Sequence, residues 1–170
     1  MTDIERYSST TPFVSIYEAF FSQVTDDMYV EWTEEETRAD SKNILMSAIS
    51  NFERPKFNIY DYDLDSIEED GSRGHFNLKL GHDETMIIAD LMLIEWIKRQ
   101  IATIDITRMK YSSSDFKLTS QASHLNSLLA LKKDFQNDIN HKQKVYRRRT
   151  INSDGTITNA FNGMGGGVLW

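Results

Sequence analysis

Two long apolar patterns, over residues 84–110 and 118–147, dominate the second half of the sequence. In the first pattern, apolar residues cover nearly the whole circumference of a helix, which indicates a central helix buried among other elements. In the second pattern, they follow one face at steps of three and four, namely Ala122, Leu125, Leu128, Leu129, Lys132, Phe135, Ile139 and Tyr146. The connection between the two is short, so they are predicted to pair as antiparallel helices.

Two shorter helices are predicted in the first half of the chain. Thr11 before Pro12 is typical of a cap residue followed by proline at the first helical position. Thr33, with Glu36 three residues later, forms the sequence signature of a capping box. The helix that it starts is expected to stop before Pro55, because the residue before a proline avoids the helical conformation.

An extended segment is predicted between these helices and the long pair, around residues 56–83. Apolar and polar residues alternate over 57–64 and again over 76–80, which is the period of a strand. The sequence EEDGSRG between the two runs is typical of a turn. A small hairpin and a pair of ordered loops fit this pattern equally well.

The last twenty residues differ from the rest, since residues 151–170 hold five of the eight glycines and show no periodic face. We therefore predict a mainly α fold: a helical bundle over 1–150 with the long antiparallel pair, the small extended or β segment, and a flexible C-terminal arm over 151–170. The arm carries too few apolar groups to fold alone. Docking on a partner or a neighbouring subunit is expected for its apolar residues, which are Ile157, Phe161, Met164, Val168, Leu169 and Trp170. The alternative is that Trp170 folds back into the chain's own bundle.

Composition excludes several classes of protein. Hydrophobic residues make up 39% of the 170 residues, which is enough for a core. There are no cysteines, so disulfides, thiolate zinc sites and cysteine nucleophiles are excluded. No apolar run reaches the roughly 18 residues of a membrane span, and the first residues lack the pattern of a secretory signal. A soluble product made in a cytoplasm, with no membrane association, is expected.

Chemical motifs are incomplete. Asp61, Asp63 and Asp65 have the opening spacing of a calcium loop, but Ser66 and Ser72 occupy the positions that need glycine and glutamate. Turn formation or an acidic contact patch explains these aspartates better. The four histidines lack a metal-binding spacing, and neither a phosphate-binding loop nor a nucleophile elbow is present. The sequence therefore predicts no metal, no cofactor and no enzymatic activity.

Charge is divided between the two parts of the chain. Residues 1–71 hold 17 acidic and 5 basic residues, whereas residues 72–170 hold 9 acidic and 14 basic ones. The basic end of the last helix includes Arg147, Arg148 and Arg149, which we predict to be a charged interface. Cations there also suit the helix dipole alone, an acidic protein surface, or phosphates. Contact between copies and chance clustering on solvated faces are both consistent with the division.

Several segments together carry a resemblance to a known class of protein. They are FERPKFNIYDYDL from residue 52, DETMIIADLMLIEWIKRQI from 83, YSSSDFKLTSQASHLNSLLALKKD from 111, and YRRR before the glycine-rich tail. The chain resembles the small neck proteins of tailed bacteriophages, the head–tail connector or adaptor class, over roughly residues 30–155. The most characteristic residues are Asp115, Phe116, Ser120, Gln121, Ala122, His124 and Leu125.

The resemblance implies a structural virion protein in the neck, between head and tail. It implies a helical subunit repeated in a ring, usually of twelve, around the DNA channel. Its expected partners are the portal protein and another neck or tail protein, with DNA passing through without specific binding. Two rival functions stay open: a helical nucleic-acid-binding regulator that uses the basic last helix, and a tail-completion or baseplate protein.

Overall fold

The structure is a computed structural model that describes residues 7–24, 32–68, 71–110, 118–151 and 157–159. Its elements are β1 (Thr11–Pro12), α2 (Phe13–Phe21), α4 (Glu34–Ser50), β2 (Tyr62–Ile67), β3 (Arg73–Phe76), α5 (His82–Lys110), α6 (Leu118–Arg148), β4 (Arg149–Ile151) and β5 (Ile157–Asn159). The mainly α fold predicted from the sequence is confirmed, including the long antiparallel pair and the small β segment.

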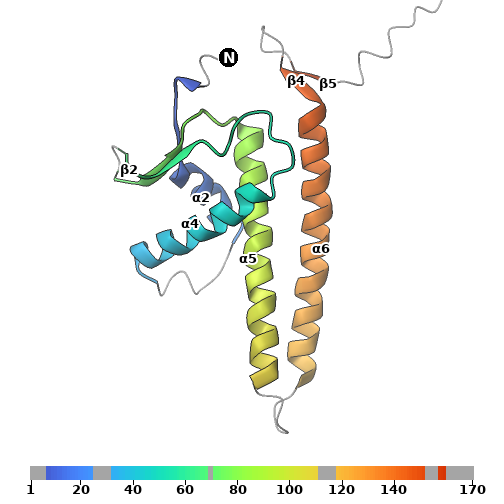
Figure 1. The fold of residues 1–170 in the computed structure, drawn as a ribbon. Coiled ribbons are helices and arrows are strands. Elements are labelled where there is room, and N and C mark those ends of the chain that lie inside the picture. Colours follow the sequence, from blue (N-terminus) through green and yellow to red (C-terminus); the bar gives the residue numbers. More distant parts are fainter. Residues whose placement is uncertain (1–6, 25–31, 69–70, 111–117, 152–156, 160–170) are drawn as a thin grey trace, which may run out of the picture.

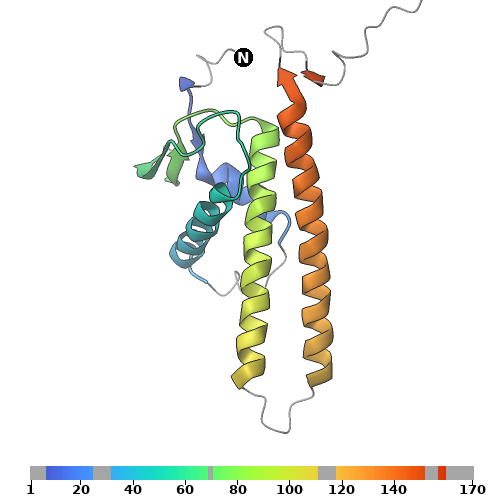
Figure 2. The ribbon, with the colours of Figure 1, turned by 45° about the vertical axis from the view of Figure 1, so that its right-hand side comes forward.

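The long pair forms a hairpin in which α5 and α6 lie side by side over their whole length (Figure 1). Helices α2 and α4 and the small sheet lie on the side of α5 that faces away from α6, as both ribbon views show (Figures 1 and 2). These elements reach only the first half of α5. The second half of the hairpin extends beyond them.

The core sits around the first half of α5, because this helix packs against α2, α4 and α6. The buried apolar residues of α5 are Ile87, Ile88, Ala89, Leu91, Met92, Leu93, Ile94 and Ile97. They cover all sides of the helix, as the sequence predicted. From α2 the core receives Phe13, Ile16 and Phe20, and from α4 it receives Ile44, Leu45, Ala48 and Ile49.

The stripe predicted on α6 is only partly buried. Leu125, Ile139 and Tyr146 are buried against α5, but Leu128 is half-buried and 46% of Leu129 is exposed. The prediction that the whole stripe packs in the core is therefore wrong for Leu129. Periodicity places a residue near the packed face, but α5 alone is too narrow to cover a stripe that drifts around α6.

Thr11 does not cap α2, contrary to the prediction. Its hydroxyl donates a hydrogen bond to the carbonyl of Leu78 at 2.9 Å and accepts one from the backbone N–H of Leu80 at 2.8 Å. Pro12 is the N-cap of α2, and the two residues form β1. Thr11 is buried, so its hydroxyl serves long-range backbone groups that would otherwise lack partners.

The capping box at the start of α4 is confirmed. The Thr33 hydroxyl accepts from the Glu36 N–H at 3.2 Å, and the Glu36 carboxylate accepts from the Thr33 N–H at 2.9 Å. These bonds satisfy two helix-end donors reciprocally. The helix ends at Ser50, before Pro55, as expected.

The extended segment forms a hairpin of β2 and β3, and β1 adds a third strand on the other side of β3. Gly74 in β3 has a φ of +84°, and a Cβ atom there would lie 2.5 Å from the Phe13 ring. Glycine is thus required both for the backbone conformation and for the close approach of α2. The strand predicted over 76–80 ends at Phe76, although Leu78 and Leu80 are buried.

The first part of the predicted arm forms a strand pair that the sequence did not predict. β4 and β5 pair antiparallel, with Arg149 opposite Asn159 and Ile151 opposite Ile157. The predicted boundary between residues 150 and 151 falls within β4. The flexible arm predicted for the remaining residues lies outside the described part of the chain.

Candidate functional site

The root of the arm is the C-terminal end of α6, which lies beside the N-terminal end of α5 (Figure 1). Tyr146 is buried here, and its hydroxyl donates to Oε1 of Glu84 at 3.0 Å. Only 4% of Glu84 is exposed, and its Oε2 accepts the backbone N–H of Gly81 at 2.8 Å. A buried carboxylate that receives two hydrogen bonds fixes the last turn of α6 on the first turn of α5.

The loop after α4 closes over Tyr146. The Phe52 ring packs edge-on against the Tyr146 ring at a centroid distance of 5.7 Å. Lys56 places its ammonium 4.7 Å from the centroid of the same ring and also donates to the carbonyl of Arg149. A cation over an aromatic face is attracted by the ring quadrupole. The chain therefore enters β4 from a firmly held position.

The three arginines of the predicted charged interface point in different directions. Arg149 binds Asp83 at the start of α5, with Nη1 and Oδ2 2.6 Å apart. Arg147 lies 3.8 Å from the carboxylate of Glu53. Arg148 is exposed, and no ion pair joins it to any described acid. The structure thus does not bring the three together on one free surface, because two of them pair within the chain.

Two further polar side chains hold α6 at this end, and the sequence analysis missed both of these contacts. Gln143 is buried and its Oε1 accepts the backbone N–H of Glu53 at 2.6 Å. Lys142 binds Asp90 of α5 at 2.8 Å, and this hydrogen bond raises the pKa of the Lys142 ammonium above its usual value. Their partners are distant in sequence, so helical periodicity alone carried no signal for them.

A groove of about 500 Å³ runs along this end of the hairpin, between α5 and α6. Its apolar lining comes from Met86, Ile87 and Val145, and charged groups surround it. The residues around the apolar floor are His82, Asp83, Asp138, His141, Lys142, Tyr146 and Arg149. Such a groove can accept an apolar side chain while the surrounding groups bind the polypeptide backbone.

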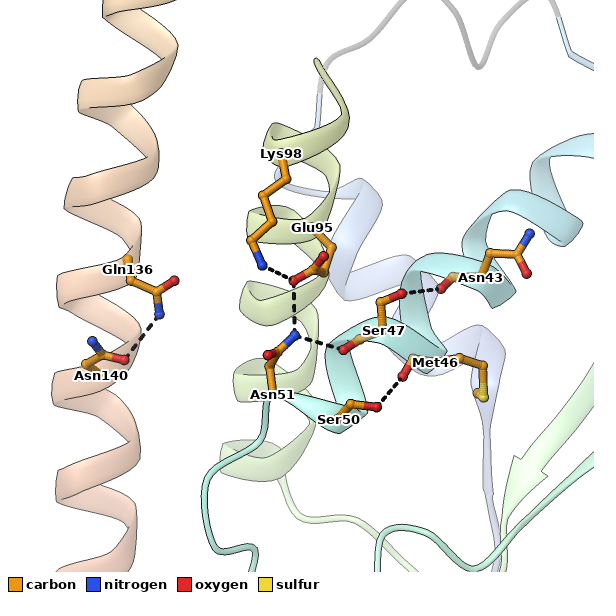
Figure 3. Close-up of polar contacts among 9 residues, drawn as sticks. All are labelled: Asn43, Met46, Ser47, Ser50, Asn51, Glu95, Lys98, Gln136 and Asn140. Carbon is orange, nitrogen blue, oxygen red and sulfur yellow. Dashed lines mark hydrogen bonds and ion pairs between the residues drawn. The ribbon is translucent and has the colours of Figure 1, made fainter. Parts of the chain in front are cut away.

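The opposite end of α4 is tied to α5 by neutral and paired groups (Figure 3). Asn51 donates to Oε1 of Glu95 at 3.0 Å and to the carbonyl of Ser47 at 2.9 Å, and Lys98 also binds Glu95. On α6, Gln136 donates to Asn140 at 3.2 Å. This face presents amides, hydroxyls and one neutralised ion pair, and hence little electrostatic preference.

A serine, a histidine and a glutamate meet on the β2–β3 hairpin but cannot act as a proton relay. Nδ1 of His75 lies 2.8 Å from the Ser66 hydroxyl and 2.6 Å from the Glu68 carboxylate. In a catalytic triad, the serine and the acid contact opposite ring nitrogens. The other nitrogen of His75 faces Asn77 at 3.0 Å instead.

The aspartates of the incomplete calcium loop have structural partners. Oδ1 of Asp63 accepts the backbone N–H groups of Asp65 and Ser66, which lowers the pKa of the Asp63 carboxyl. Asp61 accepts from Asn77 at 2.6 Å. Within the described ranges, no three acidic or histidine side chains form a group that could hold a metal ion. The absence of a metal stays a prediction.

Of the predicted arm residues, Ile157 lies in β5 opposite Ile151. Phe161, Met164, Val168, Leu169 and Trp170 lie outside the described residues. Their docking on a partner thus stays a prediction.

Comparisons with known proteins add no relative. No protein-family model, no curated protein and no solved structure matches the chain. Among the helices in the described part of the chain, none combines the length and apolarity needed to cross a membrane.

Proposed function

We propose that the chain is a structural protein of a tailed-bacteriophage particle, which joins the portal of the head to the tail. In this proposal, copies form a ring in the neck, with twelve favoured, and DNA passes through its channel without specific binding. The portal protein lies on one side of the ring, and another neck or tail protein lies on the other. The resemblance of residues 30–155 to neck proteins is the basis for naming the particle.

The anchored root of the arm is the observation that carries the proposal. Tyr146, Glu84, Lys56 and Arg149 hold the end of α6 in one position, and the chain continues from there into residues 160–170. A rigid base is not needed for a tail without function. It is useful for an arm that must reach a defined partner from each subunit of a ring.

Energetics favour a partner for the arm. Ordering a residue's backbone costs about 1–2 kcal/mol, and the arm is rich in glycine, which has the most conformational freedom to lose. Burial of apolar surface contributes about 25 cal/mol per Å², so Trp170 with Val168 and Leu169 can offset part of this cost on a suitable surface. A ring multiplies the contribution, because many arms bind the same assembly together.

Deletion of residues 160–170 tests this function, because it removes the arm but retains the β4–β5 pair. The truncated protein is expected to keep its melting temperature, to lose copurification with the portal, and to be missing from particles. Trp170→Ala should weaken copurification, and the matched control Asn162→Ala should not. Electron microscopy of particles carrying labelled protein would locate it in the neck.

Two outcomes would contradict the proposal. If the truncated protein still assembles into particles, the arm is not the link to the head. If truncation destabilises the isolated protein by more than about 2 kcal/mol, the arm belongs to the chain's own core.

A second function is favoured by the exposed cations on α6. Lys133, Lys144 and Arg148 are all exposed, and such a row can contact phosphates. A regulator that binds nucleic acid would show salt-dependent binding in a titration with duplex DNA. The neck protein is expected to show none at physiological salt.

A further inference from the structure

Opposite sides of the subunit carry opposite charge. Helix α6 contains six basic and two acidic residues, whereas α4 and β2 together contain six acidic and two basic residues. Both ribbon views place α6 on one side of α5, and α4 and β2 on the other (Figures 1 and 2). The division of charge seen in the sequence is thus also a division in space.

The side of α6 that faces away from α5 carries an outer basic face, which we define as Lys133, Lys144 and Arg148. Successive residues of a helix are 100° apart, so these three positions lie within about 60° of one another. All three side chains are exposed, and no described acid forms an ion pair with them. Lys142, Arg147 and Arg149 are engaged within the chain and do not belong to this face.

The opposite side carries an acidic edge, which we define as Glu35, Asp61, Asp63 and Asp65. All four are exposed, and no described cation pairs with them. Glu35 and Asp65 line one groove between α4 and β2, although they come from different elements. Arg38 lies in the same groove, but it is paired with Glu34.

The position of β2 makes this edge accessible. Within the described part of the chain, β2 pairs with β3 alone, so it is the outer strand of its sheet. Along β2 the side chains alternate between half-buried and exposed, and Asp63 and Asp65 share the exposed face. Charged side chains on an outer strand prevent edge-to-edge strand pairing. They leave the edge suited to contact through side chains.

We infer that copies of this chain associate head to tail, with the outer basic face of one copy against the acidic edge of the next. Contacts between equal faces would oppose like charges, whereas this arrangement places unlike charges together. A head-to-tail contact leaves one free face at each end, so it repeats until a ring closes. The inference rests on the proposed ring and names the surfaces that form it.

The arrangement also changes which basic residues should matter. The sequence favoured Arg147, Arg148 and Arg149 as the charged interface. The structure assigns two of these to contacts inside the subunit and leaves Lys133 and Lys144 exposed beside Arg148. Reversal of the lysines therefore tests the contact between copies without disturbing the root of the arm.

The test measures self-association of the full-length protein by mass photometry and sedimentation velocity. At 50 mM NaCl the unmodified protein should form oligomers, and association should weaken at least about tenfold at 500 mM, because salt screens exposed charges. Lys133→Glu with Lys144→Glu should give monomers at 50 mM NaCl. Arg54→Glu with Lys79→Glu makes the same change in net charge at exposed positions elsewhere and should leave association unchanged.

A mixing experiment tests the pairing of the two faces. Glu35→Lys with Asp65→Lys should also give monomers. When the two interface variants are mixed, every head-to-tail contact between unlike copies again joins opposite charges, so oligomers should return. Recovery on mixing also shows that both variants are folded.

The inference is overturned if the unmodified protein is monomeric at 50 mM NaCl and about 100 μM, or if the interface variants associate as well as their control. Failure of mixing to restore oligomers would equally exclude this pair of faces. Failure of the proposed function is a separate result: oligomers would form through these faces, but the protein would be absent from phage particles.

Discussion

The two halves of α5 have the same helical backbone and very different surroundings. From Ile87 to Ile97 the apolar residues are buried, because α2, α4 and α6 surround the helix. From Arg99 to Ile106 the described residues are half-buried or exposed, and 54% of Ile106 is accessible. The comparison shows that packing, rather than helix length, decides where the stability of this hairpin resides.

The largest expected effect is the difference between core substitutions in the two halves. Ile94→Ala, at a site with 2% exposure, should lower the free energy of unfolding by about 2–5 kcal/mol, since it leaves a cavity. Leu129→Ala, in the uncovered half, should cost less than about 0.5 kcal/mol. Urea denaturation measures both. Equal losses would mean that the far half of the hairpin is also part of the core.

A smaller effect is expected where the two helices meet at the root of the arm. Tyr146→Phe removes the hydroxyl that donates to Glu84 and leaves that buried carboxylate with one donor fewer. The expected loss is about 1–3 kcal/mol in the free energy of unfolding. Tyr60→Phe is the matched control, because 55% of Tyr60 is exposed, and it should be nearly neutral. Indistinguishable melting curves would show that the buried contact contributes nothing.

The smallest effect concerns α4, which covers the first half of α5. Thr33→Ala breaks the capping box and should lower the melting temperature by about 2–4 °C. The box also lowers the pKa of Glu36 below 4.5, through hydrogen bonds to the ionised carboxylate. Its contribution is therefore complete above pH 4.5 and is lost as the pH falls through the lower pKa of the folded state.

Thermal unfolding of Thr33→Ala between pH 2 and 7 checks this sign. The difference from the unmodified protein should be constant at neutral pH and should shrink in acid. A difference that grows in acid would refute the role assigned to Glu36.

Local patterns predicted most of the fold. The capping box, the long helices and the β2–β3 hairpin follow from spacings within a few residues, and the structure confirms them. Contacts between distant residues were missed: Thr11 with Leu78, and Glu84 with Tyr146. In each case a polar side chain was assigned to solvent or to a helix end, because its partner is more than sixty residues away in the chain.

The candidate site was less predictable than the fold. The sequence placed Arg147, Arg148 and Arg149 together, since they are consecutive. Three-dimensional packing separates them, because Glu53 and Asp83 reach two of the three. The exposed face that includes Lys133 and Lys144 requires knowledge of which side of α6 meets α5. The apolar stripe indicated that side approximately, but the charge on the opposite side of the subunit was visible only in three dimensions.

The central position of α5 also has a consequence for how the protein is made. Synthesis proceeds from the N-terminus, so α2 and α4 leave the ribosome before the helix on which they pack. Phe21, the end of α2, precedes Ile97 by 76 residues. At about 5–20 residues per second, the apolar faces of both helices lack their main partner for roughly 4–15 s during translation. The nascent chain is thus most exposed to chaperones and to aggregation before the second half of the message is read.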